Sequence, residues 1–324
     1  MSRDRRTSDN IKSAILGAVI GDALGVPYEF SSCEAMKKSP ATGMIGNGTY
    51  NQPVGTWSDD SSMLLCTAES LSQGYDLNDM AQRFLRWFDE GYMTPHGETF
   101  DYGITTAEAL RALRRGVSPL ESGGSGENDN GNGSLMRILP IALRYHAAPR
   151  AELLQHASDV SSITHAHPRS RLACGIYCLL VAELLNSSES DSEALRGMLR
   201  KTLSALRTEL PGLVADSDMN EELSHFDRLL APGFENLPES EISSGGYVLH
   251  TLEAAVWCVL STESYEEAVL VAVNLGGDTD TTACVAGGLA GVVYGMEGIP
   301  ETWLEALQKS SEVIKIADRV AFQS

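Results

Sequence analysis

The spacing of apolar residues constrains the fold most strongly, because they recur three and four positions apart through almost the whole chain. This spacing places apolar side chains on one face of a helix, and no sustained two-residue alternation indicates strands. We therefore expect an all-α fold, a compact multi-helix bundle that spans residues 1–324 as a single domain, with residues 1–9 flexible. The predicted helices are 11–20, 61–71, 77–88, 105–113, 133–145, 151–162, 169–185, 190–206, 246–260, 265–275, 280–294 and 304–316.

The charge balance excludes several classes of partner. The chain has 24 Lys and Arg residues against 44 Asp and Glu residues, which gives a net charge of −20. This balance argues against nucleic acid, whose phosphates need a basic face, and against anionic membrane surfaces. No apolar run approaches the roughly 20 residues that span a bilayer. The six cysteines form no C-x-x-C pair, so we predict a cytoplasmic protein with reduced thiols.

Polar, acidic or glycine-rich segments adjoin many of the predicted helices. Loops of this kind at one end of a helical bundle can build a single cleft. We therefore expect the functional site to lie where these loops meet. They are residues 21–29, 55–61, 100–103, 122–134, 164–168 and 276–282.

The first acidic pair, Asp59 and Asp60, follows Ser58 and precedes an apolar helical segment. Taken alone, this arrangement is typical of a helix start, where a serine caps the helix and carboxylates lie in its positive first turn. Two adjacent carboxylates repel each other, however, so a bound cation is an alternative explanation.

The second cluster favours that alternative. Asp278, Asp280 and Thr281 repeat the combination of two carboxylates and a hydroxyl at a helix start, after Gly276 and Gly277. Carboxylate and hydroxyl oxygens are hard ligands that suit Mg²⁺, Ca²⁺ or Mn²⁺. If the two clusters meet across a cleft, they can hold two ions.

Five motifs in this chain resemble those of a known family, the ADP-ribosylglycohydrolases, which include the dinitrogenase reductase-activating glycohydrolases of bacteria. The resemblance runs from about residue 11 to residue 294, and all five motifs stand in the family's order. They are G-A-V-I-G-D-A-L-G-V-P-Y-E at 17–29, W-S-D-D at 57–60, G-N-G-S-L-M-R at 131–137, T-H-A-H at 164–167 and G-G-D-T-D-T at 276–281.

The resemblance implies an all-α enzyme that binds two divalent ions, Mg²⁺ or Mn²⁺, and removes ADP-ribose from modified proteins. Ser58 occupies a position that is often Thr in the family, and it retains the hydroxyl. The implied metal ligands are Ser58, Asp59, Asp60, Asp278, Asp280 and Thr281.

The same resemblance implies catalytic roles for Asp60, Asp101 and Glu29. Asp101 looks like the acidic residue of the arginine-directed branch, where an Asp-aliphatic-Gly turn approaches the scissile ribose, although Tyr102 replaces the aliphatic residue here. An ordinary Asp-x-Gly turn is the alternative for Asp101. Glu29 resembles a carboxylate near the metals that gates access, and a surface position at a helix end is its alternative.

The remaining predictions concern the nucleotide. The glycine-rich segment 131–134 is expected to open a helix, whose free N–H groups can cradle a phosphate. One of the two histidines at 165 and 167 is expected to face the cleft. The adenine needs an apolar or aromatic wall, for which Tyr102 is the candidate. The predicted substrate-binding residues are Gly131, Asn132, Gly133, Ser134, His165, His167 and Tyr102.

We therefore predict metal-dependent hydrolysis of the N-glycosidic bond between ADP-ribose and an arginine of a modified protein. Positive charge develops on the sugar during such a cleavage, and metals can orient the ribose hydroxyls and activate water. Asp101 can hold the guanidinium, stabilise the charge or move a proton. The alternatives are serine-linked or other ADP-ribose conjugates, a two-metal phosphoesterase, and a non-catalytic, crystallin-like ADP-ribose binder. A partnership with an ADP-ribosyltransferase is left open.

Overall fold

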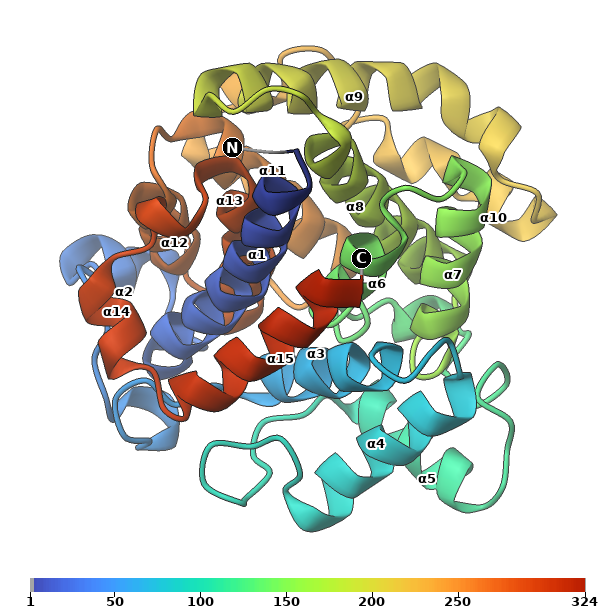
Figure 1. The fold of residues 1–324 in the computed structure, drawn as a ribbon, viewed down its shortest axis with the longest axis horizontal. Coiled ribbons are helices and arrows are strands. Elements are labelled where there is room, and N and C mark those ends of the chain that lie inside the picture. The colour runs from blue at the N-terminus through green and yellow to red at the C-terminus, as the bar shows by residue number, and fades with distance from the viewer. Residues whose placement is uncertain (1–2, 324) are drawn as a thin grey trace.

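Helices form all the regular secondary structure in residues 3–323, the part of the chain that the computed structural model describes (Figure 1). The all-α prediction is therefore confirmed, and within these residues only three isolated bridges link extended segments. The helices are α1 (Arg3–Gly25), α2 (Cys33–Lys38), α3 (Asp59–Leu71), α4 (Leu77–Glu90), α5 (Ile104–Arg114), α6 (Leu139–Tyr145), α7 (Arg150–Ser162), α8 (Pro168–Asn186), α9 (Ser192–Leu213), α10 (Ser217–Glu221), α11 (Val248–Ser261), α12 (Tyr265–Asn274), α13 (Thr279–Tyr294), α14 (Glu301–Ala306) and α15 (Ser310–Gln323).

Helix α1 extends further at both ends than the sequence indicates. Residues 3–9, where we expected flexible chain, form its first turns, and residues 1–2 lie outside the described part. Residues 21–25, which we assigned to a loop, form its last turn. This turn contains polar and glycine residues, so it lacks the apolar spacing that predicts a helix. These residues instead contact other helices.

Two further predictions need correction. The segment 304–316 is split into α14 and α15, since Lys309 adopts a left-handed conformation with φ 45° and the Gln308 N–H donates to the Gly55 carbonyl, at 3.0 Å. The short helices α2 and α10 were not predicted. Both are only one or two turns long, so they carry little periodic signal.

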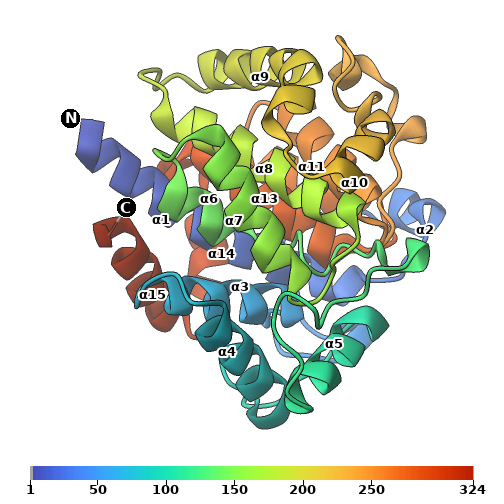
Figure 2. The ribbon, with the colours of Figure 1, turned by 90° about the vertical axis from the view of Figure 1, so that its right-hand side faces the viewer.

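The central contact of the fold is the packing of α1 against α13, which lie side by side in the middle of the molecule (Figures 1 and 2). Glycines let the two backbones touch. A Cβ atom added at Gly17 would lie 2.4 Å from the Gly287 carbonyl oxygen, and one at Gly21 would lie 2.1 Å from that of Ala283. This close approach fixes the end of α1 beside the start of α13, where the second acidic cluster lies.

The same helix corrects our expectation about apolar runs. Residues Arg6–Tyr28 are long and apolar enough to cross a membrane by length and composition, but 89% of that window is buried inside the protein. Ile11, Ile15 and Val19 have no exposed surface. The stretch is apolar on every side because α1 is surrounded by other helices.

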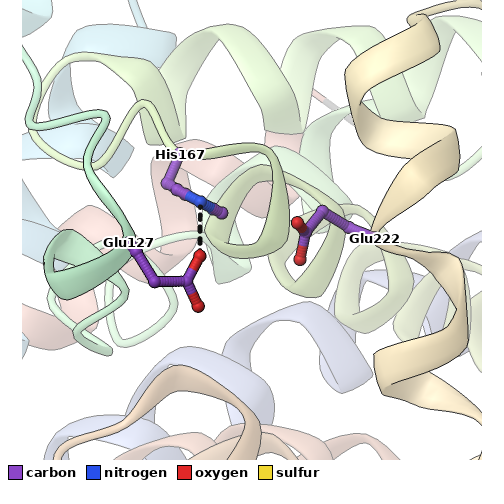
Figure 3. A group of neighbouring side chains, drawn as sticks. All are labelled: Glu127, His167 and Glu222. Carbon is purple, nitrogen blue, oxygen red and sulfur yellow. Dashed lines mark ion pairs between the residues drawn. The ribbon is translucent and has the colours of Figure 1, made fainter.

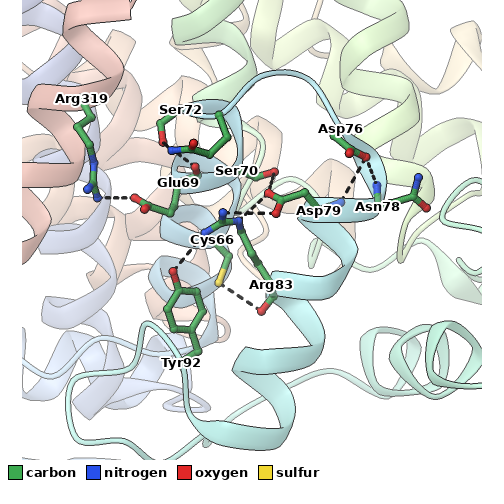
Figure 4. Close-up of polar contacts among 11 residues, drawn as sticks. Cys66, Glu69, Ser70, Ser72, Asp76, Asn78, Asp79, Arg83, Tyr92 and Arg319 are labelled. Atoms are coloured by element: carbon green, nitrogen blue, oxygen red, sulfur yellow. Dashed lines mark hydrogen bonds and ion pairs between the residues drawn. The ribbon is translucent and has the colours of Figure 1, made fainter.

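Polar contacts fix α3 between α4 and α15 (Figure 4). Glu69 near the end of α3 pairs with Arg319 of α15. The Ser70 hydroxyl donates to Asp79 of α4 at 2.6 Å, and Asp79 accepts a hydrogen bond from Arg83 at 2.7 Å. These contacts hold one end of α3, so that its other end presents Asp59 and Asp60 at a defined place.

Candidate active site

A cleft of about 350 Å³ opens where the starts of α3, α5 and α13 meet the glycine-rich loop before α6. Several predicted site residues, namely Ser58, Asp60 and Asp280, are buried. The predicted residues that line the cleft are Glu29, Asp59, Asp101, Tyr102, Gly131, Asn132, Gly133, His165, Asp278 and Thr281.

One group of three carboxylates combines both predicted acidic clusters with a residue of α1. One oxygen each from Asp22, Asp60 and Asp280 lies within 4.8 Å of the others, and all three side chains are at most 1% exposed. The Thr281 hydroxyl reaches Asp60 at 3.4 Å, which joins the start of α13 to the start of α3. The two clusters thus meet, although they are separated by about 220 residues.

Asp22 is the site residue that the sequence analysis missed. Its carboxylate accepts hydrogen bonds from the N–H groups of Ser58 and Ser61, at 3.0 Å and 2.9 Å, and from the Ser58 hydroxyl at 2.9 Å. Ser58 in turn caps α3, and its hydroxyl oxygen also lies 3.0 Å from a carboxylate oxygen of Asp60. A lone aspartate within an apolar helix must find such partners, because burying an unpaired charge is costly. That cost is the signal that can reveal it in the sequence.

A second group shares Asp280 with the first. One oxygen each from Glu29, Asp101 and Asp280 lies within 4.8 Å of the others. Glu29 follows a short 3₁₀ turn at the end of α1, and Asp101 precedes α5 in a left-handed conformation with φ 51°. The structure therefore brings Glu29 and Asp101, two of the three predicted catalytic carboxylates, to the acidic end of the cleft, and the third, Asp60, belongs to the adjoining group.

The second cluster is linked to the glycine-rich loop through Asp278. One of its carboxylate oxygens accepts a hydrogen bond from the Asn132 side-chain amide at 2.8 Å. The Asp278 side chain makes no capping hydrogen bond to α13, so helix capping does not explain it. Asp59 is 6% exposed and faces the cleft from the first turn of α3.

Burial raises the pKa values of the carboxyl groups of Glu29, Asp60, Asp280 and Asp22, and repulsion by neighbouring carboxylates adds to this effect at the first three. Burial, followed by the charge of Asp101, raises the pKa of Glu29 to about 9. Burial also raises the pKa of Asp60, with Asp22 as the next cause, and that of Asp280, with Asp60 as the next cause. Burial raises the pKa of Asp22 to about 6 against the opposing effect of its hydrogen bonds. Within the described residues, no basic side chain forms an ion pair with these five aspartates and glutamates.

This arrangement fits a divalent cation. The buried oxygens Glu29 Oε2, Asp60 Oδ1, Asp278 Oδ1 and Asp280 Oδ2 have no hydrogen-bond partner. Buried polar atoms almost always have a hydrogen-bond partner, so four buried oxygens without one, around a single cleft, indicate that a positive charge binds there. The donor set consists of carboxylate and hydroxyl oxygens, which suits hard metal ions.

The glycine-rich loop also lines the cleft, but it does not open a helix. Residues 133–137 form successive turns, and α6 begins only at Leu139. Gly131, Asn132 and Gly133 line the cleft, whereas the Ser134 side chain points into the core. Its hydroxyl accepts a hydrogen bond from Ser161 at 2.9 Å.

The two histidines have different surroundings. His165 lines the cleft, and burial lowers its pKa to about 3, so that its imidazole is neutral near pH 7. His167 does not line the cleft. Its ring accepts a hydrogen bond from the Arg169 N–H at 3.1 Å and lies 3.3 Å from a carboxylate oxygen of Glu127, as Figure 3 shows. His167 thus belongs to a neighbouring polar cluster.

Arg169 is the centre of that cluster, and the sequence analysis did not single it out. Its guanidinium donates to Glu222 at 2.6 Å, to Glu127 at 2.7 Å and to the Tyr247 hydroxyl at 3.1 Å. Glu127, His167 and Glu222 are close enough to hold a metal, but the guanidinium already supplies their positive charge. The cluster connects the start of α8 to the loop that carries Gly131.

The fold and the cleft define an all-helical protein with a carboxylate-rich, metal-compatible site. The family model described as ADP-ribosylglycohydrolase matches residues 2–324. The chain therefore belongs to the ADP-ribosylglycohydrolase family and is a glycosyl hydrolase.

Individual relatives agree with this assignment. The chain is 30% identical to ADP-ribosylarginine hydrolase Tri1 of Serratia proteamaculans, over 98% of this chain and 80% of the relative. It is 29% identical to ADP-ribosyl-[dinitrogen reductase] glycohydrolase of Rhodospirillum rubrum, over 94% and 92% of the two chains. A solved structure described as an ADP-ribosylglycohydrolase-related protein complex superposes with a TM-score of 0.79 at 33% identity and covers 99% of both chains.

Proposed function

We propose that the protein hydrolyses the N-glycosidic bond between ADP-ribose and an arginine side chain of a modified protein, in a reaction that needs two divalent ions, Mg²⁺ or Mn²⁺. This proposal rests on two sets of three carboxylate residues that have Asp280 in common, and some of their buried oxygens have no hydrogen-bond partner. The similarity to a protein named ADP-ribosylarginine hydrolase supports the choice of arginine.

The ions would be held by Ser58, Asp59 and Asp60 from α3 and by Asp278, Asp280 and Thr281 from α13. Bound divalent ions supply positive charge that orients ribose hydroxyls and lowers the pKa of water. Asp22 keeps Ser58 and the first turn of α3 in place through its hydrogen bonds. The protein thus positions the distal ribose at the acidic end of the cleft.

Asp101 and Glu29 act on the scissile bond. The arginine guanidinium is cationic before the bond breaks and leaves as neutral guanidine when positive charge passes to the sugar. Two carboxylates at the same end of the cleft can bind the cation and then stabilise the positive charge on the sugar. We assign Asp101 to the guanidinium, because its turn projects into the cleft beside Asp59. Glu29 lies beside it, since one carboxylate oxygen of each residue is within 4.8 Å of the other.

The ADP moiety extends away from the carboxylates, since phosphates and carboxylates repel each other. The loop residues Gly131 and Gly133 line the cleft beside His165. A Cβ atom at Gly133 would lie 2.8 Å from the His165 ring, so only glycine leaves this space open. Tyr102, which we expected to flank the adenine, lies beside Asp101 and is assigned to the acceptor side.

Hydrolysis of other conjugates is the second candidate function. The chain is 25% identical to ADP-ribosylhydrolase ARH3 of Danio rerio over 96% of its length. In a serine-linked conjugate the serine oxygen must gain a proton to leave as a neutral alcohol, so this reaction would need a protonated carboxyl group in place of an ionised one. We also propose that the protein is cytoplasmic, that its substrate is an ADP-ribosylated protein and that an ADP-ribosyltransferase is a partner.

The test is to incubate the protein and Mg²⁺ with arginine-, serine- and glutamate-linked ADP-ribosyl peptides and to identify the products. We expect free ADP-ribose from the arginine-linked peptide and no reaction in the presence of EDTA. Release from the serine-linked peptide alone would refute the arginine assignment. AMP as the product would instead indicate a phosphoesterase.

Asp60→Asn is the matched variant for the metal assignment. It keeps the size of the side chain but removes a charge from the centre of the cluster. We expect turnover to be lost while the melting temperature stays close to that of the wild type or rises, because repulsion is relieved. Full activity in this variant would contradict the metal assignment.

A further inference from the structure

Three large apolar side chains are exposed at one end of the cleft. Phe30 is 72% exposed, Ile104 is 79% exposed and Tyr102 is 44% exposed, and all three line the cleft. In the described part of the chain nine large apolar residues are exposed, and these three are the ones that border the active site. Such a group at the mouth of a cleft marks a binding surface. We call Phe30, Tyr102 and Ile104 the acceptor rim.

The position of Phe30 is imposed by the backbone. Phe30 has φ 63°, a left-handed conformation that is unfavourable for a bulky residue. Its N–H donates to the Gly277 carbonyl at 2.7 Å, and the Gly277 N–H donates to the Ser31 carbonyl at 2.7 Å. The start of α13 therefore holds an aromatic ring in solvent at a conformational cost that no burial offsets. Strain of this kind is typical of functional positions.

The opposite side of the rim is equally fixed. Ile104 is the first residue of α5, and the buried face of this helix is formed by Thr106, Ala107 and Leu110. Ile104 faces away from that packed surface, so the fold does not need its apolar side chain. Tyr102 packs edge-on against Phe88, which sets the direction of its ring.

The charges of the cleft decide which part of the substrate meets the rim. Glu29 directly precedes Phe30, and Asp101 directly precedes Tyr102, so the rim surrounds the acidic end. The ADP phosphates are repelled from this end and lie toward Gly131 and His165. The group beyond the scissile bond, which is the acceptor, must therefore leave the cleft across the rim.

We propose that the acceptor rim docks the polypeptide that carries the ADP-ribosylated residue, by contact with apolar side chains that flank it. This inference rests on the proposed function and adds to it a preference for sequence context. A rim of apolar groups around a carboxylate pair suits a segment in which the modified arginine stands among apolar neighbours. Because the chain carries a net charge of −20, acidic flanking residues are disfavoured.

The experiment compares three substrates: free ADP-ribosyl-arginine, a peptide with leucines flanking the ADP-ribosylated arginine, and a peptide with aspartates and serines there. The variants are Phe30→Asn, which tolerates the left-handed backbone, and Ile104→Ser. Phe322→Asn and Leu120→Ser are the controls, since both residues are exposed and do not line the cleft.

We expect each rim variant to lower kcat/KM about tenfold for the leucine-flanked peptide and less than twofold for free ADP-ribosyl-arginine. The controls should leave all three values unchanged. An equal loss on free ADP-ribosyl-arginine would show that the rim contacts ADP-ribose, and unchanged values on every substrate would show that it docks nothing. Either result overturns the proposal.

The proposed function is tested separately by wild-type turnover of free ADP-ribosyl-arginine. If that turnover is absent, binding of the two fluorescently labelled peptides to the wild type and to the rim variants still tests the rim. Tighter binding of the leucine-flanked peptide that is lost in Phe30→Asn supports it. Equal binding of both peptides to all variants rejects it.

Discussion

The Cα of Gly21 faces the carbonyl oxygen of Ala283 so closely that an added methyl group would lie 2.1 Å from it. Gly21 adjoins Asp22 in α1, and Ala283 follows the acidic start of α13. The contact therefore sets the distance between Asp22 and Asp280, two members of one carboxylate group. The close packing of α1 against α13 therefore determines the geometry of the site.

Gly21→Ala is predicted to separate α1 from α13. The backbone oxygen cannot move aside, so the free energy of unfolding should fall by about 1–3 kcal/mol, as for other overpacked cores. The affinity for Mn²⁺ should fall as well. Chemical denaturation and isothermal titration calorimetry measure the two effects.

Gly197→Ala is the matched control for this prediction. Gly197 lies within α9, and a Cβ atom there meets no heavy atom within 4 Å. Alanine favours the helix over glycine by about 0.5–1 kcal/mol, so this variant should be more stable than the wild type. If both variants behave alike, the close approach of α1 and α13 does not determine the site.

The site residues that were predicted from the sequence have local signals. Asp59 and Asp280 lie in the first turns of strongly apolar helices, and such starts can be recognised from a short window. Asp22 has only one local signal, its place as a single aspartate in an apolar helix, and its partners on α3 are about 36 residues away. The turn that begins at Gly131 was mistaken for a helix start, since only its contacts with the chain around Gly246 distinguish the two.

Asp22→Asn is predicted to weaken metal binding. The amide N–H₂ would face the N–H groups of Ser58 and Ser61, which donate to the carboxylate in the wild type. Loss of such supporting contacts typically costs about 10–100-fold in metal affinity. Titration calorimetry with Mn²⁺ measures the loss. Asp76→Asn, at the exposed cap of α4, is the control and should bind metal normally.

Metal-free protein is predicted to lose stability as the pH rises from 7 to 8.5. Glu29, with a pKa of about 9, keeps its proton in the folded state, whereas an unfolded glutamate is already ionised. The folded state thus binds more protons, so the free energy of unfolding falls by about 1.4 kcal/mol per pH unit for each retained proton. Bound Mg²⁺ favours the ionised carboxylates and should abolish this slope.

Thermal denaturation in EDTA and in Mg²⁺ across this range measures the difference. His165, with a pKa of about 3, is neutral in the folded state throughout, and its contribution is limited to lower pH. The buried cysteines affect both samples equally. Parallel pH profiles with and without Mg²⁺ would indicate that the carboxylates do not hold the metal.

Arg169→Gln is predicted to raise KM more than it changes kcat. Removal of the guanidinium leaves Glu127 and Glu222 without their cation, so the loop that leads to Gly131 loses its ion pair with α8. None of the hydrogen bonds and ion pairs that Arg169 forms within the described residues involves Asp101 or a proposed metal ligand. We expect KM for ADP-ribosyl-arginine to rise about tenfold, which corresponds to about 1.4 kcal/mol of lost substrate binding. Steady-state kinetics separates the two parameters.

Two further variants distinguish positioning from simple destabilisation. Arg171 lies on α8, as Arg169 does, and forms an ion pair with Asp216. Arg171→Gln removes this ion pair and should leave KM unchanged. Arg169→Lys restores the charge but not the planar fork that reaches Glu127 and Glu222 together, so its KM should lie between those of the wild type and Arg169→Gln. A fall in kcat at constant KM would mean that Arg169 acts on the chemistry, whereas a lower melting temperature with unchanged kinetics would mean that it only stabilises the fold.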